Sequence, residues 1–316
     1  MLVSAFAAVA MVVAAPQTPA SPPNPASQSQ TPPSSPAAQD PGDATDLGTV
    51  IVEGTLQQRV ERFVEEVGAP PPGQRLARWD DLICVGVANM NVRYAQFMAD
   101  RVSQRAADLD LTIGEPGCRP NILVVATNDA SGLAARLIDA NPKGFRPSAA
   151  STDLGQDALE RFRTSTSPVR WWHVSLPVSV DTGEVAANLD GEPPVVAVRD
   201  ASRLRSSVRE DLARVLIILD VSRIGEISFG ALSDYVAMVA LAQVDPAADM
   251  SGYPTILNLF AERSATAALT DWDRDYLTSL YSASRDRARA SQQVREIGAA
   301  MIGARRADES APAHTD

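Results

Sequence analysis

Val215-Leu216-Ile217-Ile218-Leu219-Asp220 is the stretch around which the chain is organised. Its aliphatic and β-branched residues run without interruption and end in an acid, which predicts a buried strand. After a turn at residues 225–230, the segment 231–243 carries apolar residues at spacings of three and four, which predicts an amphipathic helix. Asp245-Pro246 ends that helix, because proline cannot continue it. A strand followed by a helix is therefore expected at the centre of the fold.

A closing helix is predicted further on, from Thr270 to Tyr281. Thr270 can cap its N-terminus, and Asp271 and Asp273 lie in the first turn, where the helix dipole favours acids. Its inward face is formed by large apolar and aromatic residues, namely Trp272, Tyr276, Leu277, Leu280 and Tyr281. This spacing is typical of a helix packed on a core.

The order of strand, helix, loop and closing helix resembles the C-terminal half of the zincin metallopeptidases. In that family the first helix carries HExxH, the loop carries a further zinc ligand, and the closing helix follows the pattern LTxxDxxxLxxLY. The residues that match this pattern are Leu269, Thr270, Asp273, Leu277, Leu280 and Tyr281. The resemblance implies an α+β fold, a zincin-like mixed sheet with helices, in a single main domain over residues 47–303.

The metal site of that family is missing from this chain. Aligning the two helices places Tyr235-Val236-Ala237-Met238-Val239 where HExxH would stand. Zinc peptidases need two imidazoles one turn apart and a carboxylate beside them, and none of these five side chains can take those roles. The third-ligand position falls near Asp245. The resemblance therefore implies a non-catalytic scaffold without metal or cofactor. The exported segment as a whole also resembles a family of alphaproteobacterial exported proteins that carries no known activity.

The N-terminus predicts export. Residues 2–15 form an almost unbroken apolar run, which is typical of a secretory signal and shorter than the ~20 residues of a membrane span. An uncleaved N-terminal anchor is the alternative. Residues 16–46 are rich in Pro, Ser and Ala and predict a disordered linker, and residues 304–316 predict a disordered tail. A periplasmic location is expected.

The charge of the chain limits its partners. A net charge of −11 and a pI near 4.7 argue against binding to nucleic acid or to an anionic membrane, because both need a basic surface. Contact with a membrane is expected only through an uncleaved N-terminus. A peptide or a cell-envelope protein is the expected partner.

The two cysteines, Cys84 and Cys118, predict a disulfide, since paired thiols of an exported chain are oxidised. The bridge would close a loop of about 35 residues and stabilise the fold by ~3–4 kcal/mol. A thiol nucleophile with His173 as its base is the alternative, and zinc binding by both thiols and His173 would lack a fourth ligand.

The segment 168–177 contains Trp171, Trp172 and His173 and predicts a strand. Its alternation places the two tryptophans on opposite faces, so both faces should contact other groups. The edge strand of a zincin lies along the cleft and pairs with bound peptide, so the resemblance makes Trp171, Trp172, His173, Tyr235 and Asp245 candidate binding residues. A strand packed on both sides, with His173 held by a hydrogen bond, is the structural interpretation.

Leu47–Thr55 predicts a first strand of the domain, because it is short and rich in β-branched residues. It also looks like a segment near the start of TonB-dependent outer-membrane receptors, and such a strand could add to a partner's sheet. Residues 56–67 predict a helix, and residues 202–212 predict a solvated charged stretch.

Three functions remain open from the sequence. The first is a non-catalytic exported domain that binds a peptide or an envelope partner. The second is a metal-independent or atypical hydrolase that uses acids such as Asp220, Asp234 or Asp245. The third is an accessory protein of an outer-membrane receptor, which depends on residues 49–55.

Overall fold

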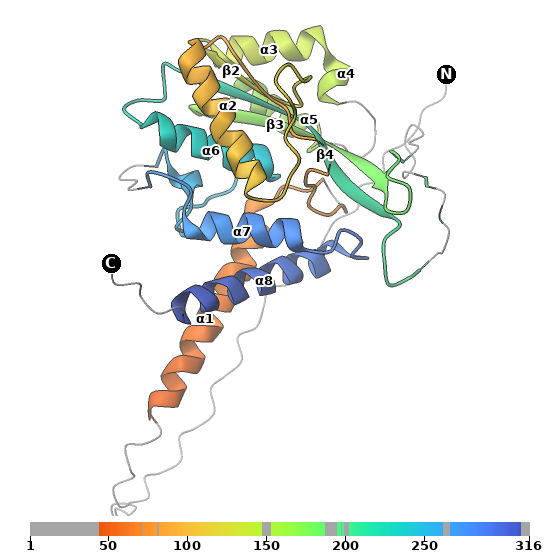
Figure 1. Cartoon of the computed structure of the whole chain (residues 1–316), viewed down its shortest axis with the longest axis vertical. Coiled ribbons are helices and arrows are strands. Elements are labelled where there is room, and N and C mark those ends of the chain that lie inside the picture. The colour runs from red at the N-terminus through yellow and green to blue at the C-terminus, as the bar shows by residue number, and fades with distance from the viewer. Residues whose placement is uncertain are drawn as a thin grey trace, which may run out of the picture. The chain divides into compact units, whose positions relative to one another are not determined.

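The computed structural model describes residues 44–71, 73–80, 82–146, 153–186, 195–196, 198, 202–261 and 266–310. The described residues from Asp46 to Ser310 belong to one compact unit. The predicted signal segment 1–15 and most of the linker lie outside the described residues. Figure 1 shows helices packed on a single mixed sheet, so the predicted α+β fold in one main domain is confirmed.

The sheet has four strands in the described chain: β1 (Val85–Ala88), β2 (Ile122–Thr127), β3 (Val169–Ser179) and β4 (Val208–Asp220). Their spatial order is β1-β2-β4-β3. β1, β2 and β4 run parallel, whereas β3 is antiparallel to β4 and forms one edge. The predicted strands at 168–177 and 215–220 are therefore present, and β4 begins earlier than the apolar run that predicted it.

The helices are α1 (Ala44–Val67), α2 (Val92–Ala107), α3 (Ala130–Ala140), α4 (Pro142–Phe145), α5 (Gln156–Thr164), α6 (Phe229–Leu241), α7 (Asp271–Ser282) and α8 (Ala290–Ser310), with a 3-10 turn at Ile256–Asn258. α2 and α6 cover one face of the sheet, and α3, α4 and α5 cover the other (Figure 1). The sheet therefore separates two apolar cores. Ile217 belongs to the larger one and Ile218 to the smaller, as expected for neighbours in a strand.

α6 is buried around its whole circumference rather than on one face, because the sheet, α2 and the C-terminal helices enclose it. This corrects the amphipathic helix predicted from the spacing. Its acid Asp234 is fully buried and paired with Arg101 at 2.7 Å and Arg105 at 3.1 Å, both on α2. A buried carboxylate needs such partners.

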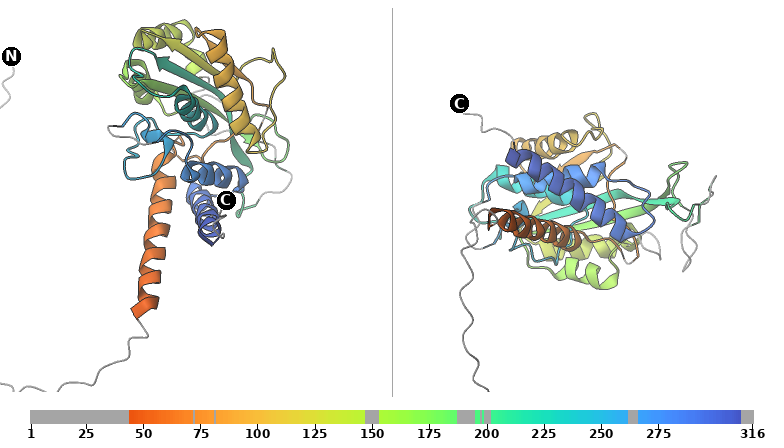
Figure 2. Two further views of the ribbon diagram at one scale, coloured as in Figure 1. Left: turned by 60° about the vertical axis from the view of Figure 1, so that its left-hand side comes forward. Right: turned by 90° about the horizontal axis from the view of Figure 1, so that it is seen from below.

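α1, α7 and α8 pack together beside this sandwich (Figure 2). Phe63 of α1 meets Trp272 and Tyr276 of α7 edge-on, each with ring centroids 5.4 Å apart. The helix predicted over residues 56–67 is part of α1, and its apolar residues Val60, Phe63, Val64 and Val67 are all buried. α8 continues to Ser310, beyond the expected end of the domain at residue 303.

The strand predicted at Leu47–Thr55 is wrong, since these residues belong to α1. Each residue added to an existing helix gains a backbone hydrogen bond, and the preference of β-branched residues for strands is weaker than this gain. Gly48 and Gly54 do not interrupt the helix. The segment therefore offers no strand with which to extend a partner's sheet.

The disulfide between Cys84 and Cys118 is confirmed, with Cα atoms 6.1 Å apart. It lies at the β1 side of the sheet, and the loop that it closes contains α2. Both sulfurs are therefore committed, and neither thiol can act as a nucleophile or zinc ligand while the bridge is intact.

Candidate functional site

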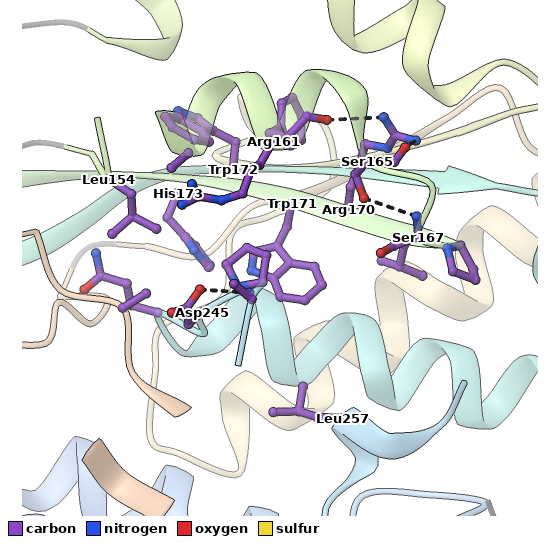
Figure 3. Close-up of a pocket in the computed structure, with 18 of the residues that line it drawn as sticks. Leu154, Arg161, Ser165, Ser167, Arg170, Trp171, Trp172, His173, Asp245 and Leu257 are labelled. Carbon is purple, nitrogen blue, oxygen red and sulfur yellow. Dashed lines mark hydrogen bonds between the residues drawn. The ribbon is translucent and has the colours of Figure 1, made fainter. Parts of the chain in front are cut away.

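A pocket of about 550 Å³ lies along β3 and brings the five predicted binding residues together (Figure 3). Trp171, Trp172, His173, Tyr235 and Asp245 all line it. Its other walls come from α5 and the turn after it, from the loop that follows α6, and from the 3-10 turn. No described residue of β4 lines the pocket, so it lies on the outer side of the edge strand.

The hydrogen-bond register shows which backbone groups of β3 face this pocket. Asp220 donates its N–H to the carbonyl of Pro168 at 2.8 Å, so these two residues form a hydrogen-bonded pair of the antiparallel ladder. Because such pairs alternate, the backbone groups of Arg170 and Trp172 also face β4. Those of Val169, Trp171 and His173 face outward, and no other part of the described chain bonds to them.

The edge is covered further along. After a bulge between Val174 and Ser175, the outward groups of Pro177 and Ser179 pair with the returning chain. Ala186 donates to the carbonyl of Pro177 at 2.8 Å, and Ser179 donates to the carbonyl of Glu184 at 2.8 Å. The open part of the edge, defined here as residues 169–173, lines the pocket and is roughly 17 Å long at 3.3 Å per residue.

The two tryptophans anchor β3 in both cores. The Trp171 indole N–H donates to the carbonyl of Val244 at 3.0 Å, and that of Trp172 donates to the carbonyl of Phe145 at 2.9 Å. Both side chains are about 6% exposed. The prediction that both faces of this strand contact other groups is confirmed, and the indoles hold the open edge in place.

His173 is held by a hydrogen bond, as the structural interpretation of this residue predicted. Its Nε2 lies 2.8 Å from the carbonyl oxygen of Val239, in the last turn of α6. Because a carbonyl only accepts, Nε2 carries the proton in this contact. Trp79 and Tyr281 donate to the next two carbonyls, of Ala240 at 2.9 Å and Leu241 at 2.7 Å. Three side chains from other parts of the sequence thus donate hydrogen bonds to the last carbonyls of α6, which have no partner within the helix.

Burial lowers the pKa of His173 to about 4, because the interior disfavours the imidazolium. We expect the titration of His173 alone to lower the free energy of unfolding by roughly 3 kcal/mol between pH 6.5 and pH 4, because the unfolded chain binds the imidazole proton at a higher pH than the folded chain does. Other titrating groups contribute equally to the wild-type protein and to a His173 variant, so the contribution is the difference between their two pH profiles. Chemical denaturation across this range would measure the loss, and His173→Gln should remove it. The matched control is His314→Gln, outside the described residues, which should retain the wild-type profile. A His173→Gln profile parallel to the wild-type one would contradict the assignment.

Tyr235 and Asp245 border the pocket from the α6 side. Tyr235 is buried and meets Trp171 and Phe260 edge-on, with ring centroids 6.1 Å and 5.2 Å apart, and its burial raises its pKa. Asp245 is partly exposed and accepts a hydrogen bond from the backbone N–H of Ala247 at 2.8 Å. This contact orders the turn that closes one end of the pocket.

Two arginines line the opposite side. Arg170 is buried, and its guanidinium bonds to the hydroxyl of Ser131 and to backbone carbonyls at the end of α5, among them that of Phe162 at 3.2 Å. Arg161 is exposed, and its side chain makes no hydrogen bond or ion pair within the described chain. The sequence patterns did not identify Arg161 as a site residue. The one indication in the sequence is that Arg161 lies on a short amphipathic helix directly before the strand that carries the two tryptophans.

The acids proposed for an atypical hydrolase have separate partners. Asp220 accepts from Ser222, Asp234 is paired with the arginines of α2, and Asp245 orders its own turn. Among the described residues no group of three or more His, Cys, Asp or Glu side chains is arranged to hold a metal ion. Tyr235–Val239 lies within the buried part of α6, where the resemblance would place HExxH.

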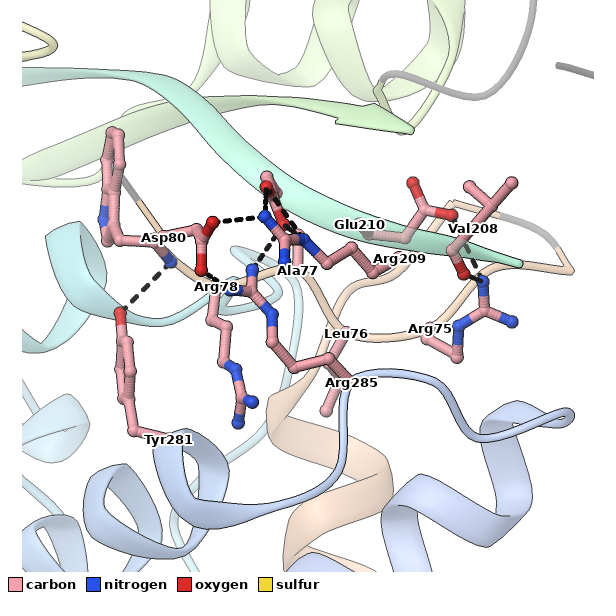
Figure 4. A network of polar contacts seen from close by, with 12 residues as sticks. Arg75, Leu76, Ala77, Arg78, Asp80, Val208, Arg209, Glu210, Tyr281 and Arg285 are labelled. Carbon is pink, nitrogen blue, oxygen red and sulfur yellow. Dashed lines mark hydrogen bonds and ion pairs between the residues drawn. The ribbon is translucent and has the colours of Figure 1, made fainter. Parts of the chain in front are cut away.

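A second polar cluster joins β4 to the segment after α7 (Figure 4). Arg285 pairs with both Asp80 and Asp211, and Arg209 pairs with the same two acids. Glu210 is 6% exposed, and its carboxylate lies 3.7 Å from the guanidinium of Arg75. Burial raises the pKa of Glu210 to about 7, although the positive charge of Arg75 acts in the opposite direction. The prediction that this part of residues 202–212 is solvated is wrong, because it forms the start of β4 and is covered by residues 75–80 and 283–287.

The sequence matches no family model, no curated protein and no solved structure. Within the described part of the chain, the helices are too short or too polar to cross a bilayer.

Proposed function

We propose that this protein is an exported, non-catalytic domain on a zincin-like scaffold, and that it binds an extended segment of a peptide or cell-envelope protein along the open edge of β3. The observation that supports this proposal is that the backbone N–H and C=O groups of Val169, Trp171 and His173 face outward, into a pocket of about 550 Å³. Unpaired strand edges are sites of strand addition, in which main-chain hydrogen bonds supply affinity.

The boundaries of this edge support the proposal. The outward backbone groups of residues 177 and 179 are hydrogen-bonded to the returning chain. Those of residues 169–173 face the pocket, whose walls there come from α5 and from the loop after α6. The order of β4, α6 and α7 is the one that the zincin resemblance implies, and in zincins the edge strand pairs with peptide. The disulfide supports export, because such bonds persist in oxidising compartments.

The test uses fluorescein-labelled, unstructured peptides of about eight residues, a length that covers the open edge. Binding should occur, and N-methylation of alternate peptide amides should abolish it in one register and spare it in the other. This pattern is specific to strand pairing, because methylation removes the donors directed at β3. Binding that is insensitive to methylation in both registers would exclude strand addition.

Ala247→Trp should weaken peptide binding at least about tenfold, or ~1.4 kcal/mol, because the indole would fill the pocket from an exposed position. The backbone N–H that Ala247 donates to Asp245 is kept in this variant. Ala107→Trp, an exposed alanine at the end of α2 that does not line the pocket, is the control and should bind normally. Equal affinity of both variants would place binding elsewhere.

The same incubations test the non-catalytic part of the proposal. Mass spectrometry should find the peptides intact after incubation with the protein, with and without added zinc. Cleavage at a defined bond would instead favour the atypical hydrolase.

A further inference from the structure

The pocket presents different chemistry to the two faces of a strand added to β3. Side chains of an extended peptide alternate between the two sides of the sheet. Trp172 points into the smaller core with α5, whereas Trp171 points into the larger core with α6. Consecutive peptide side chains would therefore meet first one of these environments and then the other.

The α5 side carries the positive charge. Arg161 lies in the last turns of α5, and Figure 3 draws it above the β3 ribbon, with Asp245 below. Its neighbour Arg163 is paired with Asp139 at 3.3 Å, and Arg170 is committed to carbonyl groups, so neither of these cations is available to a ligand. Asp153, the acid on this side, is paired with Arg146 at 3.1 Å. Arg161 is thus the unpaired cation among the described pocket residues.

The α6 side is apolar and aromatic. Leu257 and Phe260 are partly buried and line the pocket beside Tyr235. Asp245 lies at the end of this side and would repel a second acid. An apolar side chain fits this environment, because it would exclude water from the faces of partly exposed rings.

We infer that the ligand is an extended protein segment in which an acidic side chain, directed at Arg161, is adjacent to an apolar side chain directed at Tyr235, Leu257 and Phe260. This inference rests on the proposed function, since it assigns side-chain specificity to the same groove. A guanidinium can bind a carboxylate through two parallel hydrogen bonds, which adds geometric specificity to the attraction between the charges. The net charge of −11 would otherwise repel acidic ligands, so this local cation selects where such a residue can bind.

The test compares labelled peptides that carry Glu, Gln or Lys at one position and Leu, Ser or Asp at the next. Glu followed by Leu should bind at least about tenfold more tightly than Gln followed by Leu, and Asp at the second position should weaken binding. Arg161→Gln should remove the preference for Glu over Gln, and Arg161→Glu should shift it to Lys. Arg163→Gln changes the net charge equally on the same helix outside the pocket and should retain the preference.

The possible failures of the two proposals are distinguishable. Peptides that bind with the alternating N-methyl pattern, but with the same preference in Arg161→Gln and Arg163→Gln, would overturn the inferred specificity and leave strand addition in place. If no peptide of the set binds the wild-type protein, or if Ala247→Trp binds as well as Ala107→Trp, both proposals fail.

Discussion

Asp273→Ala is expected to lower the free energy of unfolding by about 4 kcal/mol. The carboxylate is fully buried and accepts from the backbone N–H groups of Ile256 at 2.8 Å and Thr270 at 2.9 Å, and also from the hydroxyl of Thr255. It thereby joins the N-terminus of α7 to the 3-10 turn. Removing it leaves these buried donors without an acceptor, and each costs about 1–3 kcal/mol.

The measurement is chemical denaturation at neutral pH, with Asp271→Ala as the matched control. Asp271 lies in the same first turn of α7 but is exposed, and its side chain pairs with Arg274. Its loss should cost less than about 1 kcal/mol, because an exposed ion pair and a dipole contact contribute little. Similar losses in the two variants would show that Asp273 acts only through the helix dipole and not through the buried network.

The N-terminus of α7 shows what local sequence rules can predict. A threonine followed three residues later by an acid is the pattern of a reciprocal cap, and both contacts of that cap are present between Thr270 and Asp273. The second role of Asp273, bonding to Thr255 and Ile256, depends on how a distant turn packs against α7. No spacing within the helix contains that information.

The predictions that failed depended on competition between segments. β-branched residues at 50–52 favour a strand in isolation, but their position next to a stable helix decides the outcome in α1. Glu210 and Asp211 have the composition of a surface segment, yet Arg75 and Arg285, far away in sequence, cover them. In the candidate site, Trp171, Trp172, His173, Tyr235 and Asp245 were named from the resemblance to zincins, and all five line one pocket. Arg161 could not be predicted, because whether it has an acidic partner depends on which groups the neighbouring acids contact in the folded chain.

The loss of the disulfide is expected to lower the free energy of unfolding by about 4 kcal/mol, the loop-entropy estimate for the residues from Cys84 to Cys118. The double variant Cys84→Ala/Cys118→Ala should show this loss in urea denaturation, and reduction of the wild-type protein should reproduce it. Backbone contacts near the bridge do not require the sulfurs: Cys84 still donates to the side chain of Asn121 at 2.8 Å and accepts from Ile122 at 3.1 Å.

The effect should therefore arise mainly in the unfolded chain, which becomes less restricted without the bridge. The dependence of the unfolding free energy on urea should become steeper, because a more expanded unfolded state exposes more surface. A loss near 4 kcal/mol with an unchanged slope would instead indicate strain or cavity formation around Cys84, which is buried in the native protein. Peptide affinity well below the unfolding midpoint should stay unchanged, since the bridge lies beside β1 and the proposed groove lies at β3, the opposite edge of the sheet.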